Sequence, residues 1–357
     1  MSKPYRSIAN ALFICALIGA CSSPPPKRPG PKFTGRVLFL NGDPANGANL
    51  SELTVYGDGY NQASLTANEV FEASASPDQT QLVYTTKDEI MLRDLRSGQV
   101  KSIIKGQGSC FAWAPDGNHF SYKQKSAAKE AGASGGSKLY VSDLDGKTKL
   151  IWEAQTESSD CGQWIASDRL VFDRFVGTLQ KKAAGEIKPN TTTIATIGDS
   201  PKFRDTPKKW SIEGICTKSN VGLVRAVDQS QLLIAKNMDH FETIDPSPGP
   251  CSECRFVGYA AQSCVPFFIE QPTSTTTELF SLNPTNWQKQ RPTSITWTFS
   301  PAAKMLIKSS ARLMVVGDVP DKLLLIDTET GDVTPFFPNK PPLPVMKSAL
   351  PVVWIEN

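Results

Sequence analysis

The sequence is poor in the residues that most often carry catalysis or bind metal ions. It has two histidines in 357 residues, His119 and His240, and neither lies in a recognisable motif. Two histidines in separate parts of the chain argue against a histidine metal centre. Residues 132–136 fit the G-x-S-x-G pattern of hydrolases, but they lie in a polar stretch rather than between a strand and a helix. The sequence therefore predicts no catalytic residue, no metal site and no cofactor.

The chain also lacks an excess of charge and a long hydrophobic run. It has 38 basic and 35 acidic side chains, and removal of Lys3 and Arg6 with an N-terminal signal leaves 36 basic ones. A balance this close to neutral argues against a nucleic-acid partner, which needs a clustered basic surface. The apolar stretch at residues 8–20 is shorter than the roughly 20 residues of a membrane-spanning helix.

The N-terminus carries the pattern of an export signal instead. Basic Lys3 and Arg6 precede the short apolar stretch, and small residues lead into Cys21, as in a secretory signal peptide. Residues 17–21, Leu-Ile-Gly-Ala-Cys, resemble the lipobox of bacterial lipoproteins, although Ile18 stands where leucine is commoner. The resemblance implies that residues 1–20 are removed and that Cys21 carries the lipid. An ordinary secretory signal followed by a chance cysteine is the alternative.

The segment after Cys21 predicts a membrane tether and a cellular location. Residues 21–34 are rich in proline, which favours an extended spacer without a packed core. Ser22 resembles the residue that directs lipoproteins to the bacterial outer membrane, so the expected location is the periplasmic face of that membrane. The folded domain is then expected to cover residues 35–357.

Two short patterns recur along this domain. The first is an apolar run that ends in an aspartate and a tight turn closed by glycine; it occurs at residues 90–98, 139–146 and 324–331. The second lies upstream of the first and contains Ser-Pro or Pro-Asp, at residues 75–78, 113–117 and 297–301. Repeats of this kind predict an all-β fold, a β-propeller of four-stranded antiparallel blades.

The second pattern marks the inner strand of each blade, the strand expected to line a central channel. Residues 351–357 read as one more inner strand, whereas residues 36–65 read as outer strands without one. Pairing of the two termini in one sheet would close the ring. This count gives seven blades, or six if residues 221–293 form one irregular blade. The expected inner strands are residues 72–78, 110–116, 161–168, 222–228, 256–262 and 295–301.

The blade pattern resembles the WD-like repeat of the TolB family. The matching residues are 114–117, Ala-Pro-Asp-Gly, and 139–146 in the same blade; the resemblance covers roughly residues 70–155 and 294–337. It implies the propeller fold and an envelope setting. It does not imply the Tol role, because the chain has no room for the α/β domain that precedes the propeller in TolB.

The repeated polar and aromatic residues have structural explanations. Each aspartate before a turn is expected to accept hydrogen bonds from backbone N–H groups, with the glycine supplying positive φ. Calcium ligation is disfavoured because the aspartates are a whole blade apart. The tryptophans at one inner-strand position are expected to pack between blades. The residues concerned are Asp94, Asp143 and Asp327, with Gly98, Gly146 and Gly331, and Trp113, Trp164, Trp297 and Trp354.

The domain has six cysteines, an even number that suggests disulfides in an exported protein. Cys110 and Cys161 precede the inner-strand tryptophans of consecutive blades by three residues, so a bridge between them is expected. Two further structural bridges are expected among Cys216, Cys251, Cys254 and Cys264, with the connectivity open. A four-thiolate zinc site or a redox C-x-x-C pair at residues 251–254 are the alternatives.

With these features and without a catalytic motif, the sequence favours an interaction scaffold tethered to the membrane, whose partners are unidentified envelope proteins. Two polar stretches, residues 124–138 and 177–190, are expected to form loops on the propeller. A hydrolase or lyase that uses acidic residues in the channel is the alternative, as is a sensor that binds a ligand there without turnover.

Overall fold

The chain divides into two units, Met1–Phe33 and Thr34–Asn357, and every residue described below belongs to the second. The export signal, Cys21 and most of the proline-rich segment lie outside the described residues. Among the described residues, no helix has the length and apolarity needed to cross a membrane. The structure, a computed structural model, describes residues 34–56, 59–66, 69–125, 137–154, 157–176, 191–206, 210–216, 221–226, 232–236, 242–244, 254–260, 263–273, 276–283, 286, 288–295, 299, 303–307, 313–318, 322–335 and 349–355.

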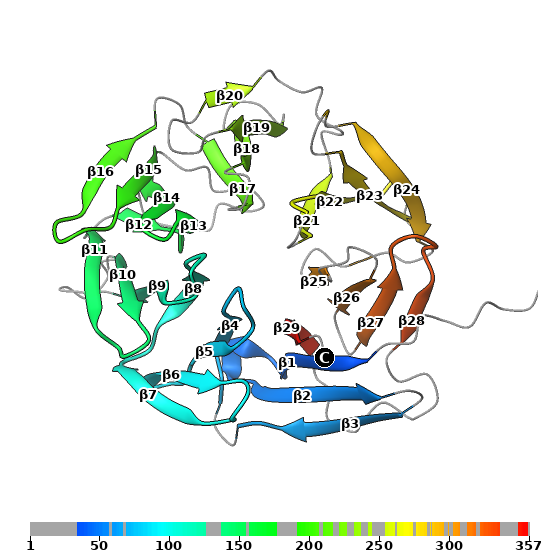
Figure 1. The fold of residues 1–357 in the computed structure, drawn as a ribbon, viewed down its shortest axis with the longest axis horizontal. Coiled ribbons are helices and arrows are strands. Elements are labelled where there is room, and N and C mark those ends of the chain that lie inside the picture. The colour runs from blue at the N-terminus through cyan, green and yellow to red at the C-terminus, as the bar shows by residue number, and fades with distance from the viewer. Residues whose placement is uncertain are drawn as a thin grey trace, which may run out of the picture. The chain divides into compact units, whose positions relative to one another are not determined.

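The second unit is all-β, and its described strands form seven sheets (Figure 1). Six are four-stranded antiparallel blades, and the seventh has five strands; counting it as a blade gives seven. Blade 1 contains β29 (Ala349–Ile355), β1 (Gly35–Asn41), β2 (Asn49–Tyr56) and β3 (Gly59–Ser64), with the short 3-10 helix η1 (Pro44–Asn46) between β1 and β2. Blade 2 contains β4 (Glu72–Ala75), β5 (Gln81–Thr85), β6 (Glu89–Asp94) and β7 (Val100–Lys105).

The remaining blades follow in chain order. Blade 3 contains β8 (Ser109–Trp113), β9 (His119–Lys125), β10 (Ser137–Asp143) and β11 (Thr148–Ala154). Blade 4 contains β12 (Glu157–Ser159), β13 (Gln163–Ala166), β14 (Arg169–Val176), β15 (Thr191–Thr196) and β16 (Lys202–Asp205). Blade 5 contains β17 (Trp210–Cys216), β18 (Val221–Ala226), β19 (Leu232–Lys236) and β20 (Glu242–Ile244). Blade 6 contains β21 (Arg255–Tyr259), β22 (Pro266–Glu270), β23 (Thr277–Leu282) and β24 (Lys289–Ile295), and blade 7 contains β25 (Lys304–Ile307), β26 (Leu313–Asp318), β27 (Lys322–Asp327) and β28 (Val333–Pro335).

Within this unit the blades follow one another around a ring (Figure 1). The inner strand of each blade contacts the inner strand of the next, in the order β4, β8, β13, β17, β21, β25, β29 and back to β4. The ring closes through the chain termini, because β29 pairs antiparallel with β1, for example Trp354 with Val37. The predicted propeller and its closure are therefore confirmed. Closure leaves no free sheet edge between the first and last blades.

The hydrophobic core lies between blades rather than within them. Each cluster of buried apolar side chains combines residues from two consecutive blades. In one, Leu139 of blade 3 packs with Leu170 and Phe172 of blade 4; in another, Val83 of blade 2 packs with Phe120 of blade 3. Burial of each such side chain contributes about 1.5–3 kcal/mol. Contacts between neighbours around a closed ring therefore hold the fold together.

The aspartates before the glycine turns act as the sequence predicts. The carboxylate of Asp94 accepts hydrogen bonds from the backbone N–H groups of Arg96 and Ser97, at 2.9 and 2.7 Å. Asp143 and Asp327 repeat the arrangement, accepting from the N–H groups of Asp145 and Lys147 and of Glu329 and Thr330, respectively. The three glycines that close these turns have φ of 74°, 83° and 77°. The turn chemistry explains these residues without a bound ion.

Two of these glycines have a second role that the sequence does not reveal. A Cβ atom at Gly146 would collide with the carbonyl oxygen of Ile103, in the outermost strand of blade 2. A Cβ atom at Gly331 would collide with the carbonyl oxygen of Ser294, in the outermost strand of blade 6. The turn of one blade thus rests against the outer strand of the preceding blade, and only glycine fits there.

Two of the expected inner strands are wrong. Residues 222–228 fall largely on β18, the second strand of blade 5, whose inner strand is β17. The inner strand of blade 7 is β25, and Ile295 ends the outermost strand of blade 6 instead of starting an inner one. All four strands of a blade share the same alternation of side chains, so periodicity cannot rank them. Trp297 lies outside the described residues, as do most of the two predicted loops.

Candidate functional site

The fifth strand of blade 4 arises because its inner strand is broken. Both β12 and β13 pair with β14: Ser159 lies opposite Arg174, and Gln163 lies opposite Val171. The two short strands are separated by residues 160–162, Asp-Cys-Gly, which leave the ladder. Blade 4 is thus a four-stranded blade whose innermost strand is interrupted at Cys161.

The side chain of Asp160 takes over hydrogen bonds at the break. Its Oδ1 accepts from the backbone N–H groups of Gly162 and Asp173, at 3.1 and 2.9 Å. The backbone N–H of Asp160 donates to the carbonyl oxygen of Asp173, at 3.0 Å. Gly162 has a φ of 72°, a conformation that glycine adopts without steric cost. The break is therefore a defined conformation that the sequence Asp-Cys-Gly can support.

A second carboxylate lies beside this one. Asp173 in β14 is only 3% exposed, and its Oδ1 accepts a hydrogen bond from the hydroxyl of Thr192, at 2.6 Å. Burial raises the pKa of Asp160 to about 6. Burial and the neighbouring Asp160 charge raise the pKa of Asp173 to about 7. Two adjacent carboxylates that resist ionisation retain a proton between them near neutral pH.

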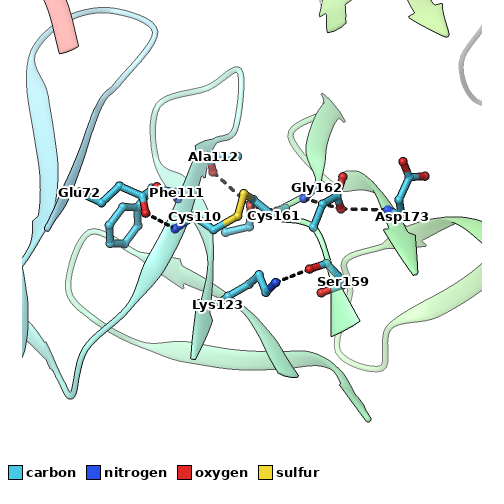
Figure 2. Close-up of a disulfide and its surroundings, with 11 residues drawn as sticks. Glu72, Cys110, Phe111, Ala112, Lys123, Ser159, Cys161, Gly162 and Asp173 are labelled. Atoms are coloured by element: carbon cyan, nitrogen blue, oxygen red, sulfur yellow. Dashed lines mark hydrogen bonds between the residues drawn. A yellow bond between two sulfur atoms is a disulfide. The ribbon is translucent and has the colours of Figure 1, made fainter. Parts of the chain in front are cut away.

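Lys123 of blade 3 brings a positive charge to the same place. Its ammonium group donates a hydrogen bond to the carbonyl oxygen of Ser159, at the end of β12 (Figure 2). Burial lowers the pKa of Lys123, whereas the charges of Asp160 and Glu72 raise it. Lys123 therefore lies between carboxylates of blade 2 and blade 4.

The Cys110–Cys161 disulfide joins blades 3 and 4 at the break, with a Cα–Cα distance of 5.1 Å (Figure 2). The register of β8 shifts between Ser109 and Ala112, and Cys110 in this bulge has a φ of 67°. The carboxylate of Glu72, in the inner strand of blade 2, accepts from the N–H groups of Cys110 and Phe111, at 2.7 and 3.1 Å. One polar cluster, defined by Glu72, Lys123, Asp160 and Asp173, thus surrounds the disulfide and connects blades 2, 3 and 4.

The inner-strand tryptophans also link these blades. The indole N–H of Trp113 donates to the carbonyl oxygen of Ser74, and that of Trp164 donates to the carbonyl oxygen of Ala112, each at 3.0 Å. In both cases the acceptor lies in the inner strand of the preceding blade. The predicted packing role is therefore accompanied by a repeated hydrogen bond between blades.

A second disulfide, Cys216–Cys264, joins blades 5 and 6, with a Cα–Cα distance of 5.7 Å. Cys254 is also disulfide-bonded, whereas Cys251 lies outside the described residues. Because Cys216 and Cys264 bond each other, a zinc site that uses all four of these cysteines as ligands is excluded. Each described disulfide therefore staples two consecutive blades.

The described residues show no cluster of three or more histidine, cysteine or acidic side chains suited to hold a metal ion. His119 lies beside the turn residue Asp116, with its Nδ1 3.5 Å from the carboxylate, and His240 lies outside the described residues. The buried Asp173 cannot reach a dissolved substrate in this conformation. Three features therefore meet at the joint between blades 3 and 4: a carboxylate pair that can retain a proton, the ammonium group of Lys123, and the disulfide.

Sequence reasoning found both cysteines of this joint but missed Glu72, Lys123, Asp160 and Asp173. Two of them leave a trace: Asp160 directly precedes the predicted inner strand at residues 161–168, and Asp173 follows the apolar residues 170–172. A carboxylate at a buried strand position signals a polar partner. Glu72 and Lys123 leave no trace, because strand ends and edges ordinarily carry charged residues.

No protein-family model and no curated protein matches the chain. Several solved structures do match. TolB from Acinetobacter baumannii is 13% identical over 96% of this chain and 68% of its own length, with a TM-score of 0.45. The periplasmic gluconolactonase PpgL of Pseudomonas aeruginosa is 8% identical over 90% of this chain and 99% of its own, with a TM-score of 0.56.

The chain has a β-propeller fold. An acylaminoacyl peptidase of Pyrococcus horikoshii matches over 85% of this chain, with 11% identity and a TM-score of 0.53, and this chain spans 51% of that protein. At these identities the likenesses establish the fold alone. The polar cluster at the joint between blades 3 and 4 therefore has to be interpreted from its own geometry.

Proposed function

We propose that this protein is a lipoprotein of the cell envelope, anchored through Cys21, whose propeller serves as a scaffold for protein–protein contacts. The observation that carries the proposal is the lipobox-like segment and proline-rich spacer ahead of a closed ring. A spacer of this composition holds a folded body away from the membrane that anchors it. The partners are then envelope proteins, and the expected location is the periplasmic face of the outer membrane.

The cysteines support export to an oxidising compartment. Five described cysteines are disulfide-bonded, and structural disulfides persist outside the reducing cytoplasm. The gluconolactonase that shares the fold is itself described as periplasmic. The described hydrogen bonds of the polar cluster run to backbone groups and to the Thr192 hydroxyl, which gives these side chains a structural role at the joint.

The test is affinity purification of the tagged full-length protein from crosslinked cells, beside the Cys21→Ala variant. Cys15→Ala is the matched control, since it alters a cysteine of the signal and leaves the lipobox intact. We expect a defined set of envelope proteins with the wild type and the control, and its loss with Cys21→Ala. Metabolic labelling with a fatty acid should mark the first two forms only.

The opposite outcome would overturn the scaffold proposal. If no protein is enriched with the wild type over an untagged strain, the rival hypothesis, a hydrolase or lyase that uses the propeller channel, takes its place. That hypothesis predicts turnover of an ester, lactone or sugar substrate by the purified protein. If labelling marks Cys21→Ala as strongly as the wild type, the anchor is not at Cys21.

A further inference from the structure

The two described disulfides share a backbone feature. Cys110 has a φ of 67° and Cys264 has a φ of 54°. These two and Gln79 are the non-glycine residues with positive φ among the described residues. Residues other than glycine rarely adopt this backbone conformation, and it persists only where the surrounding structure enforces it. In each bridge, therefore, one cysteine holds an unfavourable backbone conformation.

The two disulfides differ in exposure. Cys216 and Cys264 are buried, at 6% and 8% exposed. Their neighbours in sequence, Ile215 and Val265, pack against hydrophobic clusters. Cys110 and Cys161 are both partly exposed. A dissolved thiol therefore reaches the bridge between blades 3 and 4 more easily than the bridge between blades 5 and 6.

Charged side chains lie beside the disulfide between blades 3 and 4. The ammonium of Lys123 bonds the carbonyl oxygen of Ser159, two residues before Cys161. Both oxygens of the Glu72 carboxylate are engaged by N–H groups, one of them that of Cys110. A nearby cation favours a thiolate, and a thiol of lower pKa is the better leaving group in disulfide exchange. Lys123 is thus the cation that contacts the chain next to Cys161, where it favours opening of this partly exposed bridge against the neighbouring charges of Glu72 and Asp160.

We propose that the Cys110–Cys161 disulfide is a redox-responsive link that opens the joint between blades 3 and 4, while Cys216–Cys264 is a permanent staple. The reductant is a dithiol. One of its thiolates attacks a sulfur of the bridge, the Cys110–Cys161 bond breaks, and the other cysteine leaves as a thiolate. The second thiol of the reductant then attacks the mixed disulfide. The dithiol is oxidised to a disulfide, and two electrons and two protons pass to Cys110 and Cys161.

Opening this bridge removes the covalent link that holds the interrupted strand of blade 4 to blade 3. Residues 160–162 are then held by the hydrogen bonds of Asp160 and by the bond between the Ser121 hydroxyl and the Cys161 carbonyl oxygen, at 3.1 Å. The Cys110 backbone can also leave its positive φ. Reduction therefore changes the inner strands of blades 3 and 4, whereas the Cys216–Cys264 bridge and the β29–β1 pairing keep the ring closed. This inference does not depend on the scaffold proposal.

The test uses the oxidised full-length protein under native conditions. Dithiothreitol is added in stages, each sample is quenched with a maleimide, and labelling of each cysteine-containing peptide is measured by mass spectrometry. We expect Cys110 and Cys161 to be labelled at least about tenfold faster than Cys216 and Cys264. Near-UV circular dichroism recorded in parallel should retain the signal of a folded protein. Equal rates, the reverse order, or labelling only after unfolding would overturn the proposal.

Two variants of Lys123 test whether its charge, in addition to the exposure of the disulfide, affects the rate at which the bridge opens. Lys123→Gln removes the cation, and Lys123→Arg keeps it. We expect the glutamine variant to open the exposed bridge several-fold more slowly and the arginine variant to restore the wild-type rate. The rate at Cys216–Cys264 should stay unchanged in both variants, which shows that the fold is intact. If the glutamine variant opens the exposed bridge as fast as the wild type, Lys123 does not assist the exchange.

Discussion

A disulfide links blades 3 and 4, and another links blades 5 and 6. The first lies in polar, partly exposed surroundings, whereas the second is buried. Each disulfide links consecutive blades, and each closes a similar length of chain, 51 and 48 residues. One lies among Glu72, Lys123 and Asp160, and the other is buried. The comparison teaches that connectivity sets how much a bridge stabilises the fold, whereas the surroundings set how readily the bridge can be opened.

The largest expected effect is the loss of either bridge. Because loop closure entropy depends on loop length, the Cys110→Ala/Cys161→Ala and Cys216→Ala/Cys264→Ala variants should each lose about 4 kcal/mol in the free energy of unfolding. Urea denaturation of the oxidised proteins measures both losses. The comparison fails if one bridge contributes several kcal/mol and the other contributes nothing.

The next effect is a pH dependence that arises at the joint between blades 3 and 4. Folding raises the pKa of Asp160 and Asp173 above the ordinary value near 4, so the folded protein binds more protons than the unfolded chain between pH 4 and about 7. This contribution to stability is present below pH 4, is lost as the pH rises to about 7, and stays constant above that. Replacing Asp173 by asparagine should remove the part of this loss that belongs to Asp173, a few kcal/mol, and should leave the part that burial of Asp160 causes.

Thermal unfolding between pH 4.5 and 8 checks this prediction. The matched control is Asp205→Asn in the same blade, since the side chain of Asp205 is 52% exposed and pairs with Arg174. We expect the control to keep the wild-type pH profile. A profile for Asp173→Asn as steep as that of the wild type would show that the acid pair does not take up a proton on folding.

The smallest effect concerns the tryptophans of blades 3 and 4. Phenylalanine in place of Trp113 or Trp164 keeps an aromatic ring and removes the indole N–H that bonds the preceding blade. Each change should cost about 1 kcal/mol. Trp164→Phe should cost less than Trp113→Phe, because the Ser121 hydroxyl, which shares its one proton between the Ala112 and Cys161 carbonyl oxygens at 3.3 and 3.1 Å, can still donate to Ala112. Urea denaturation of the two variants side by side gives the order, and the reverse order would contradict this account.

Much of the fold could be predicted because its signals are local. In this type of turn an aspartate stands three or four residues before a glycine, so Asp94 and Gly98 identify their hairpin directly. The inner strands of blades 5 and 7 could not be identified in this way. They lack the Ser-Pro or Pro-Asp pattern at their ends, and alternation alone does not distinguish the strands of a blade.

The candidate site shows the opposite case. The pairing of Cys110 with Cys161 could be predicted because equivalent positions on consecutive blades lie side by side. The polar cluster could not, since Glu72, Lys123 and Asp173 are far apart in the sequence and meet only when three blades pack together. Their roles depend on burial and on the distances between side chains of different blades. Neither can be read from one segment of the sequence.

The central claim is that one joint of the ring responds to reduction while the others hold. Hydrogen exchange measured by mass spectrometry, on the oxidised protein and after mild treatment with dithiothreitol, tests it most directly. We predict faster exchange on reduction in β8, β12 and β13, with β17, β21 and the β1–β29 pair unchanged. An equal loss of protection around the whole ring, or no change at β8 and β13, would contradict the account.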